Sequence, residues 1–363
     1  MELLSVTMND GVKPRSEIEG KDNSSEDKSN YKIVRKGDMV YNSMRMWQGA
    51  NGISPCDGIV SPAYTVLMPK QEINNGYFAA LFKSANLINE FRKNSQGMTS
   101  DTWNLKYPQI ETIKIQIPSV SEQDKVSELF GVLDARIVAQ AQLIEALKKY
   151  KRGSLSALFP KKGEITPQYR FAGFTKPWEQ RKLGELPEKT YGGGTPSTTN
   201  VEYWNGNIPW LQSSNIAEGK LFDVTPKKFI SQSGLNSSAA QLIPENSIAI
   251  ITRVGVGKLA FLPFSYTTSQ DFLSMSRLTT EPYFTVYACY KKLQSELNSV
   301  QGTSIKGITK NELLAKEIKV PSYEEQKQIG EYFANLDRLI TLHQHKYDTL
   351  LSLKNAILQQ MFI

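Results

Sequence analysis

The chain has 363 residues, enough for two domains of ordinary size, with 40% hydrophobic and 22% charged residues. Its apolar runs are strand-sized, no signal-peptide pattern follows Met1, and Cys56 and Cys289 have no CxxC partner. These features argue against a membrane span, a disulfide framework and a cysteine zinc site, and they predict a cytoplasmic protein. The net charge of +7 is concentrated in residues 161–320, whose 19 basic and 13 acidic residues leave an excess of +6. Such an excess favours binding to a phosphate backbone, although solubility alone also accounts for it.

Residues 1–118 predict a mixed segment of short strands. Their 14 basic and 13 acidic residues nearly balance. Runs of β-branched and aromatic residues, such as Thr112–Ile115, alternate with Gly, Pro, Asn and Ser.

Residues 119–160 predict a long helix. Ser119 and Glu122 have the spacing of a capping box, and apolar residues then recur in steps of four and three, the pattern of a coiled-coil seam. Gln140 fills the one gap in the pattern. At ~1.5 Å per residue, about 39 residues form a rod of roughly 58 Å. The apolar seam positions are Val126, Phe130, Leu133, Ile137, Ile144 and Leu147.

Residues 161–320 predict a second mixed segment, with strand-like runs such as Ile248–Ile251, and residues 321–363 predict a second long helix. Ser322 and Glu325 repeat the capping-box spacing, and His343 fills the gap in the second seam. The apolar positions of that seam are Ile329, Phe333, Leu336, Ile340, Tyr347 and Leu350.

An internal repeat organises these segments. A shift of 203 residues lays 118–159 over 321–362 without a gap, with identities from Pro118 and Pro321 to Phe159 and Phe362. The sequence therefore predicts an α+β fold: two mixed α/β domains separated by two long helices that carry coiled-coil seams.

The two mixed segments resemble each other near their ends and differ in the sequence between those ends. Ile33–Val40 can be laid over Ile243–Ile250, and Gly97–Pro118 over Gly302–Pro321. Two modules of one fold that read different targets have this pattern, and so do two modules that have drifted. Because the first segment has no counterpart of Phe171–Trp178, we expect the first module to be N-terminally incomplete and impaired in recognition.

The sequence predicts no catalytic or metal site. Gly255–Lys258 resembles part of a phosphate loop, but Thr252 and Leu259 occupy the positions that need Gly and Ser or Thr. Glu17–Lys21 contains a nuclease-like E-x-K within a polar run that is typical of a solvated loop. His343 and His345 are two residues apart on a helix, which places them on different faces. No nucleophile–base pair is recognisable.

Three features carry a resemblance to a known family: the repeat, the matching boundaries Ile117–Gln123 and Val320–Gln326, and the module opening Phe174–Leu183. The chain resembles type I restriction–modification specificity subunits over essentially its whole length. The resemblance implies two target-recognition domains that read the two halves of a split site in double-stranded DNA. It implies two long helices that form an antiparallel coiled coil, hold these domains apart and dock two methyltransferase subunits. Restriction and translocase subunits would be further partners. No cofactor is implied in this chain: S-adenosylmethionine, ATP and Mg would belong to partner subunits, and the chain itself would be non-catalytic.

Base readout needs polar or basic side chains on elements that enter a groove. The candidates lie in or beside predicted turns, where a solvated or packing role is the alternative for each. In the second domain they are Ser213, Ser214, Asn215, Arg253, Lys258 and Lys306, and in the first they are Arg45, Trp47 and Lys106.

Three other functions are compatible with the sequence. The chain would then be an interaction scaffold that binds no DNA, a decoy that occupies methyltransferase subunits without targeting them to DNA, or a shortened subunit. The shortened subunit would pair with a second copy of the chain or with another polypeptide. A twofold dimer of identical domains would read identical half-sites.

Overall fold

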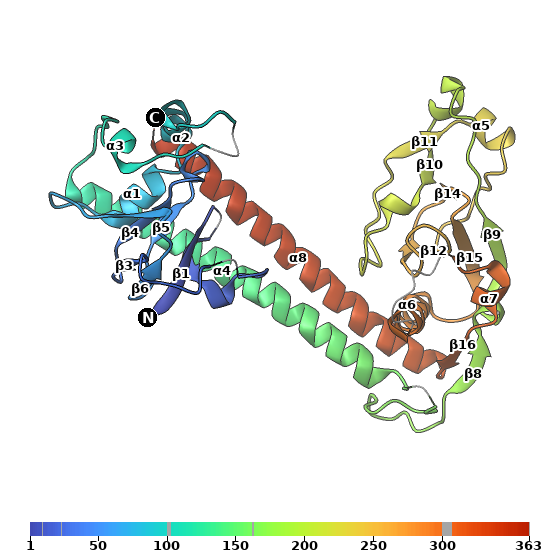
Figure 1. Cartoon of the computed structure of the whole chain (residues 1–363). Coiled ribbons are helices and arrows are strands. Elements are labelled where there is room, and N and C mark those ends of the chain that lie inside the picture. Colours follow the sequence, from blue (N-terminus) through green and yellow to red (C-terminus); the bar gives the residue numbers. More distant parts are fainter. Residues whose placement is uncertain (9, 23, 100–102, 162, 300–306, 363) are drawn as a thin grey trace. The chain divides into compact units, whose positions relative to one another are not determined.

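The computed structural model describes the chain from residue 1 to residue 362 except for residues 9, 23, 100–102, 162 and 300–306 (Figure 1). It divides into two compact units, Met1–Ile144 with His343–Ile363, and Glu145–Leu342. Both dividing points fall inside the long helices α4 (Val120–Leu158) and α8 (Tyr323–Met361). Each unit therefore contains one mixed segment and a part of both helices, a division that cuts across the four segments defined from the sequence. No helix in the described part of the chain has both the length and the apolar character needed to cross a bilayer.

The two helices pair antiparallel within each unit. In the first unit Asp134 of α4 forms an ion pair with Lys354 of α8, and Gln140 contacts His343. Residue numbers rise along one helix as they fall along the other. Because Gln140 and His343 are counterparts under the 203-residue shift, the polar gap of each seam faces the gap of the other.

The second unit repeats this pairing in its own part of the helices. Lys151 Nζ lies 2.5 Å from Asp337 Oδ1, and the hydroxyls of Ser154 and Tyr332 lie 3.0 Å apart. Lys151 and Asp337 are the repeat counterparts of Lys354 and Asp134, so the same ion pair occurs once in each unit.

Most of the seam positions are buried. In α4 the side chains less than one-tenth exposed are Val126, Phe130, Leu133, Ile137 and Ile144. In α8 they are Ile329, Phe333 and Leu336. The half-buried positions fall in the C-terminal half of each seam and are Leu147, Ile340, Tyr347 and Leu350.

The first unit contains two small sheets. In the order β2-β1-β6-β3, strand β1 pairs antiparallel with β2 and parallel with β6; in the order β5-β4-β7 all pairing is antiparallel. Three helices follow the strands and pack beside α4, with Tyr77 and Phe91 in the core that they share with Phe130 and Leu133. The strands are β1 (Glu2–Thr7), β2 (Gly11–Pro14), β3 (Lys32–Val34), β4 (Met39–Asn42), β5 (Asn51–Ile53), β6 (Gly58–Val60) and β7 (Tyr64–Leu67). The helices are α1 (Asn75–Leu81), α2 (Ala85–Asn94) and α3 (Tyr107–Ile110).

The second unit is built around the antiparallel sheet β13-β12-β15-β9, with β11-β10-β14 and the pair β16-β8 beside it. Its strands are β8 (Glu179–Lys182), β9 (Pro187–Gly192), β10 (Ile208–Leu211), β11 (Lys228–Ile230), β12 (Ser247–Ile251), β13 (Leu259–Leu262), β14 (Thr267–Thr268), β15 (Phe272–Leu278) and β16 (Glu317–Val320). Its shorter helices are α5 (Gln232–Asn236), α6 (Pro282–Ser299) and α7 (Lys310–Leu314).

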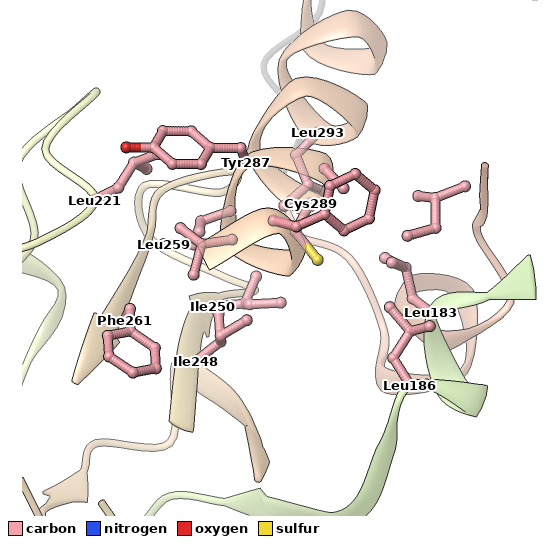
Figure 2. Packing of buried hydrophobic residues seen from close by; sticks show 14 of the residues in the cluster. Leu183, Leu186, Leu221, Ile248, Ile250, Leu259, Phe261, Tyr287, Cys289 and Leu293 are labelled. Carbon is pink, nitrogen blue, oxygen red and sulfur yellow. The ribbon is translucent and has the colours of Figure 1, made fainter. Parts of the chain in front are cut away.

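Strand β12 is buried on both faces. Side chains alternate along a strand, so Ile248 and Ile250 face α6 and share a core with Leu259 (Figure 2). Ala249 and Ile251 belong to a different core. Two-sided burial explains why this run contains no polar residue between Ile248 and Ile251.

Two sequence-based expectations differ from the structure. The predicted strand at Thr112–Ile115 is wrong: the segment has no strand partner, and Ile113 instead packs against the core of the first unit. The reciprocal capping box is also not formed at α8. The carboxylate of Glu325 accepts hydrogen bonds from Arg170 and Trp178, two residues that precede β8 in the chain.

Candidate DNA interface

The candidate segments that the structure describes in the second unit border one turn, Ser269–Asp271, which connects β14 to β15. The amide of Ser269 donates to the carbonyl of Leu211 at 2.8 Å, directly before the candidates Ser213–Asn215. The amide of Thr252 donates to the carbonyl of Asp271 at 2.7 Å, directly before the loop that carries Arg253 and Lys258. Strand ends thus bring two candidate segments, about forty residues apart in sequence, to the same turn.

Local hydrogen bonds occupy part of the first of these segments. Residues 213–215 form a 3-10 helix, and Asn215 Oδ1 accepts from the amide of Gln212 at 2.9 Å. The Oγ of Ser214 accepts from Gln212 Nε2 at 2.9 Å. Asn215 therefore shapes the loop, and Ser213 and Ser214 are the better placed to meet a ligand.

The loop between β12 and β13 presents free cations. Arg253 is exposed and Lys258 half-buried, and neither forms an ion pair within the described ranges. Gly255 and Gly257 have φ of 91° and 89°, so the loop uses backbone conformations that other residues rarely adopt. The amide of Ile308 donates to the carbonyl of Thr252 at 2.7 Å, which fixes the loop from the other side. Lys306 lies outside the described residues.

This loop is not a phosphate loop, since it closes an antiparallel hairpin and no helix follows it. The E-x-K run is likewise local structure: Arg15 donates to the carbonyls of Ile18, Gly20 and Lys21 and shapes the loop around them. Within the described part of the chain, no group of three or more His, Cys, Asp or Glu side chains is arranged to hold a metal ion.

The first unit brings aromatic and basic residues together. The rings of Trp47 and Trp103 meet edge to face with centroids 5.1 Å apart, and the guanidinium of Arg92 lies 5.6 Å from the centre of the Trp47 ring. Trp103 and Arg92 were not among the sequence-based candidates. An aromatic residue in a polar loop is a signal for Trp103, but its contact with Trp47, more than fifty residues earlier in the chain, is not encoded by the local sequence.

Arg45 and Lys106 come from the two segments that meet at this cluster. The amide of Leu105 donates to the carbonyl of Ser43 at 2.8 Å, which holds residues 103–106 beside residues 43–48. Arg45 is exposed and donates to Gln48 Oε1 at 3.4 Å, and the exposed Lys106 precedes α3. Three cations and two indole rings thus lie in or beside one pair of adjoining segments.

Comparison with known proteins identifies the family. A model of the type I restriction modification DNA specificity domain matches residues 5–149 and 175–352. The chain belongs to this family. The two matched ranges correspond to the two halves of the repeat, each containing one mixed segment and most of the helix that follows it.

Individual relatives agree with this placement. The chain is 28% identical to the specificity subunit of the Escherichia coli enzyme EcoR124I/EcoR124II over 230 residues, which are 60% of this chain and 52% of that protein. It is 23% identical to the MjaVIII specificity subunit of Methanocaldococcus jannaschii over 343 residues, covering 90% of this chain and 78% of the relative. The chain spans about half the length of the first curated relatives that it matches.

Solved structures share the fold. The S subunit of a type I restriction–modification system from M. genitalium matches with a TM-score of 0.59 and 14% identity, over 92% of this chain and 84% of that one. A chain from a study of assembly and conformational transition in a type I R-M system matches with a TM-score of 0.57 and 19% identity, over 93% and 84%. These likenesses confirm the α+β architecture with two mixed segments and long helices.

Proposed function

We propose that this chain is the non-catalytic DNA-reading subunit of a type I restriction–modification complex. The observation that carries the proposal is that each unit of a DNA-specificity family member presents loop cations that form no ion pair with any residue that the structure describes. In the second unit these are Arg253 and Lys258. In the first unit the cation is Lys106, whose neighbour Leu105 donates from its amide to the carbonyl of Ser43. Such cations can replace counterions on phosphates, and an exposed hydroxyl such as that of Ser214 can contact base edges.

Two units of one fold with different loop chemistry fit a bipartite target with unlike halves. The second unit offers Ser213, Ser214 and Arg253, whereas the first offers indole rings and guanidinium groups. Different side chains present different donor and acceptor patterns to the major groove.

The helices are the proposed docking surface for two methyltransferase subunits. On α4 of the first unit, Leu129 and Val132 are 39% and 48% exposed and lie one turn apart on a face away from the buried seam. Large exposed apolar side chains at helical spacing are typical of a protein interface. Methyl transfer with S-adenosylmethionine, and cleavage with ATP and Mg, would be carried out by partner subunits in the cytoplasm.

The salt dependence of duplex binding tests the DNA-reading role. We expect log K to fall steeply with log salt for the wild-type chain, and the Arg253→Ala, Lys258→Ala double variant to reduce the slope by about one for each phosphate that is no longer neutralised. The exposed Lys346→Ala variant is the control, because it removes a positive charge from the helix α8 and not from the loops that carry the candidate residues. A shallow slope for the wild type would favour the interaction scaffold.

Readout of bases is tested separately in cells. Co-expression with the neighbouring methyltransferase gene, followed by mapping of methylated adenines, should reveal a bipartite motif. A Trp47→Ala or Arg253→Ala variant that removes a base contact should relax one position of one half-site, at a cost of about 1–3 kcal/mol. Uniform loss of methylation with an unchanged motif would assign these side chains to phosphate contacts instead.

A further inference from the structure

The first unit contains a cavity of about 250 Å³ between α1, β5 and the two long helices. Apolar and charged side chains share its wall. Those that matter here are Asn51, Ala80, Phe130, Asp134, Lys354 and Leu358. The internal repeat shows what fills the same place in the second unit.

Equivalent hydrogen bonds show which residues of α1, beside α4, correspond to which residues of α6, beside α8. Gln123 Oε1 accepts from the amide of Asn74 at 3.0 Å, directly before α1. Its repeat counterpart Gln326 accepts from the amide of Glu281 at 2.9 Å, directly before α6. Asn74 therefore corresponds to Glu281, and α1 corresponds to the beginning of α6.

The next turn of each helix confirms this alignment. Tyr77 lies three residues after Asn74, and its ring meets that of Phe362 with centroids 5.5 Å apart. Phe284 lies three residues after Glu281 and meets Phe159, the repeat counterpart of Phe362, also at 5.5 Å.

One further turn along, the two units differ. The second unit has Tyr287, whose hydroxyl donates to Asp337 Oδ2 at 2.5 Å (Figure 2 shows the phenol beside Leu221 and Leu259). Lys151 Nζ lies 5.3 Å from the centre of this ring, and the ring of Phe333 lies 5.1 Å from it. The corresponding residue of α1 is Ala80.

The counterparts of the groups around Tyr287 line the cavity. Phe130, Asp134 and Lys354 correspond to Phe333, Asp337 and Lys151, and all three face the space beside Ala80. The carboxylate at this place is 21% exposed under the tyrosine and 53% exposed in the first unit, as expected where a covering phenol is missing.

Polar groups in the wall lack partners. Asn51 is fully buried, and its Oδ1 accepts no hydrogen bond from any described residue. The ammonium of Lys83 forms no ion pair within the described part of the chain, and burial, with a contribution from nearby Lys354, lowers its pKa. Because the wall also contains the carboxylate of Asp134, a ligand that brings a polar hydrogen is favoured over a purely apolar one.

We propose that this cavity binds a small phenol. The ring packs between Ala80 and Phe130, and the hydroxyl donates to Asp134 as that of Tyr287 donates to Asp337. The size is sufficient, since an engineered cavity of about 150 Å³ already takes up benzene. The site does not depend on the DNA-reading role, and its test is independent of that role.

Calorimetric titration of p-cresol into the full chain tests the proposal, with toluene as the ligand that lacks the hydroxyl. We expect saturable binding of one p-cresol per chain, and toluene to bind at least about tenfold more weakly because it cannot donate a hydrogen bond to the charged group. Ala80→Tyr should abolish binding by filling the cavity, whereas the exposed Ala139→Tyr on α4 should leave it unchanged.

A second variant keeps the test decisive if Ala80→Tyr does not fold. Asp134 is half exposed, so Asp134→Ala should fold and should bind p-cresol and toluene alike. The absence of saturable p-cresol binding, equal binding of p-cresol and toluene by the wild type, or full binding by a folded Ala80→Tyr variant would each overturn the assignment.

Discussion

Removal of Arg170 should strongly destabilise the second unit, because it leaves the carboxylate of Glu325 buried without a counter-charge. Arg170 Nε and Nη2 donate to the two oxygens of Glu325 at 2.9 and 2.6 Å, and the two side chains are 14% and 1% exposed. Breaking a buried ion pair by removing one partner costs about 3–5 kcal/mol. At about 2–4 °C per kcal/mol for a unit of this size, Arg170→Met should lower Tm by roughly 6–20 °C.

The repeat supplies a matched control for this experiment. Glu122 is the counterpart of Glu325 and is exposed, so Glu122→Gln should change the free energy of unfolding by less than about 0.5 kcal/mol. The double variant Arg170→Met, Glu325→Leu removes both charges and should recover much of the stability lost in the single variant. Scanning calorimetry of the full chain measures all three variants. A double variant less stable than Arg170→Met would refute the argument that the unpaired carboxylate is the cause.

Three further predictions concern the helices and their surroundings. Leu133→Asp combined with Leu336→Asp should abolish cooperative folding, because both side chains are less than one-tenth exposed; an unchanged melting curve by circular dichroism would contradict a packed seam. Gln140→Leu combined with His343→Leu should raise Tm, since a polar pair in a coiled-coil seam costs stability, and a lower Tm would show that their 2.7 Å contact is net stabilising. Burial lowers the pKa of Lys291 from 10.5 to about 8. As the pH rises, Lys291 therefore loses its proton in the folded protein before it does so in the unfolded chain, and the free energy of unfolding increases between these two pH values. Lys291→Met should remove that rise in urea unfolding at about pH 7 and about pH 10, and an equal rise in both proteins would assign it to other groups.

The long helices could be predicted from the sequence because their signals are local. Ser119 and Ser322 directly precede α4 and α8, and the alternation of apolar steps by four and three depends only on neighbours within two turns. The antiparallel α+β arrangement expected from the resemblance is confirmed by the solved structures of similar fold.

The sheets could not be predicted to the same degree, because strand pairing depends on residues distant in sequence. Strand β1 pairs with β6, more than fifty residues further along the chain. Thr112–Ile115 has the composition of a strand, yet without a neighbouring strand its Ile113 packs against a helical core instead. Composition predicts that such a segment is apolar and extended, and its tertiary partners decide whether it joins a sheet.

The candidate interface shows the same limit. Residue type placed Ser214 and Asn215 among possible base contacts, but Asn215 is engaged with the backbone of its own loop. Conversely, Arg92 belongs to a helix whose composition gives no sign of a binding role, and only the fold places its guanidinium over the Trp47 ring. Whether these side chains touch DNA stays a prediction.

The distribution of identities within the repeat has a physical cause. Asp134 pairs with Lys354, and their counterparts Asp337 and Lys151 form the same pair in the other unit. Each ion pair joins the two helices, so neither residue of a pair can change alone without leaving a charge without its partner. Glu122 and Glu325 are also identical, although they meet different surroundings in the two units. Glu325 holds Arg170, whereas its counterpart is exposed, because the segment that supplies the arginine differs between the units. Contacts between the helices therefore account for the identity of Asp134 with Asp337 and of Lys151 with Lys354, whereas the mixed segments supply different partners to the same helix position.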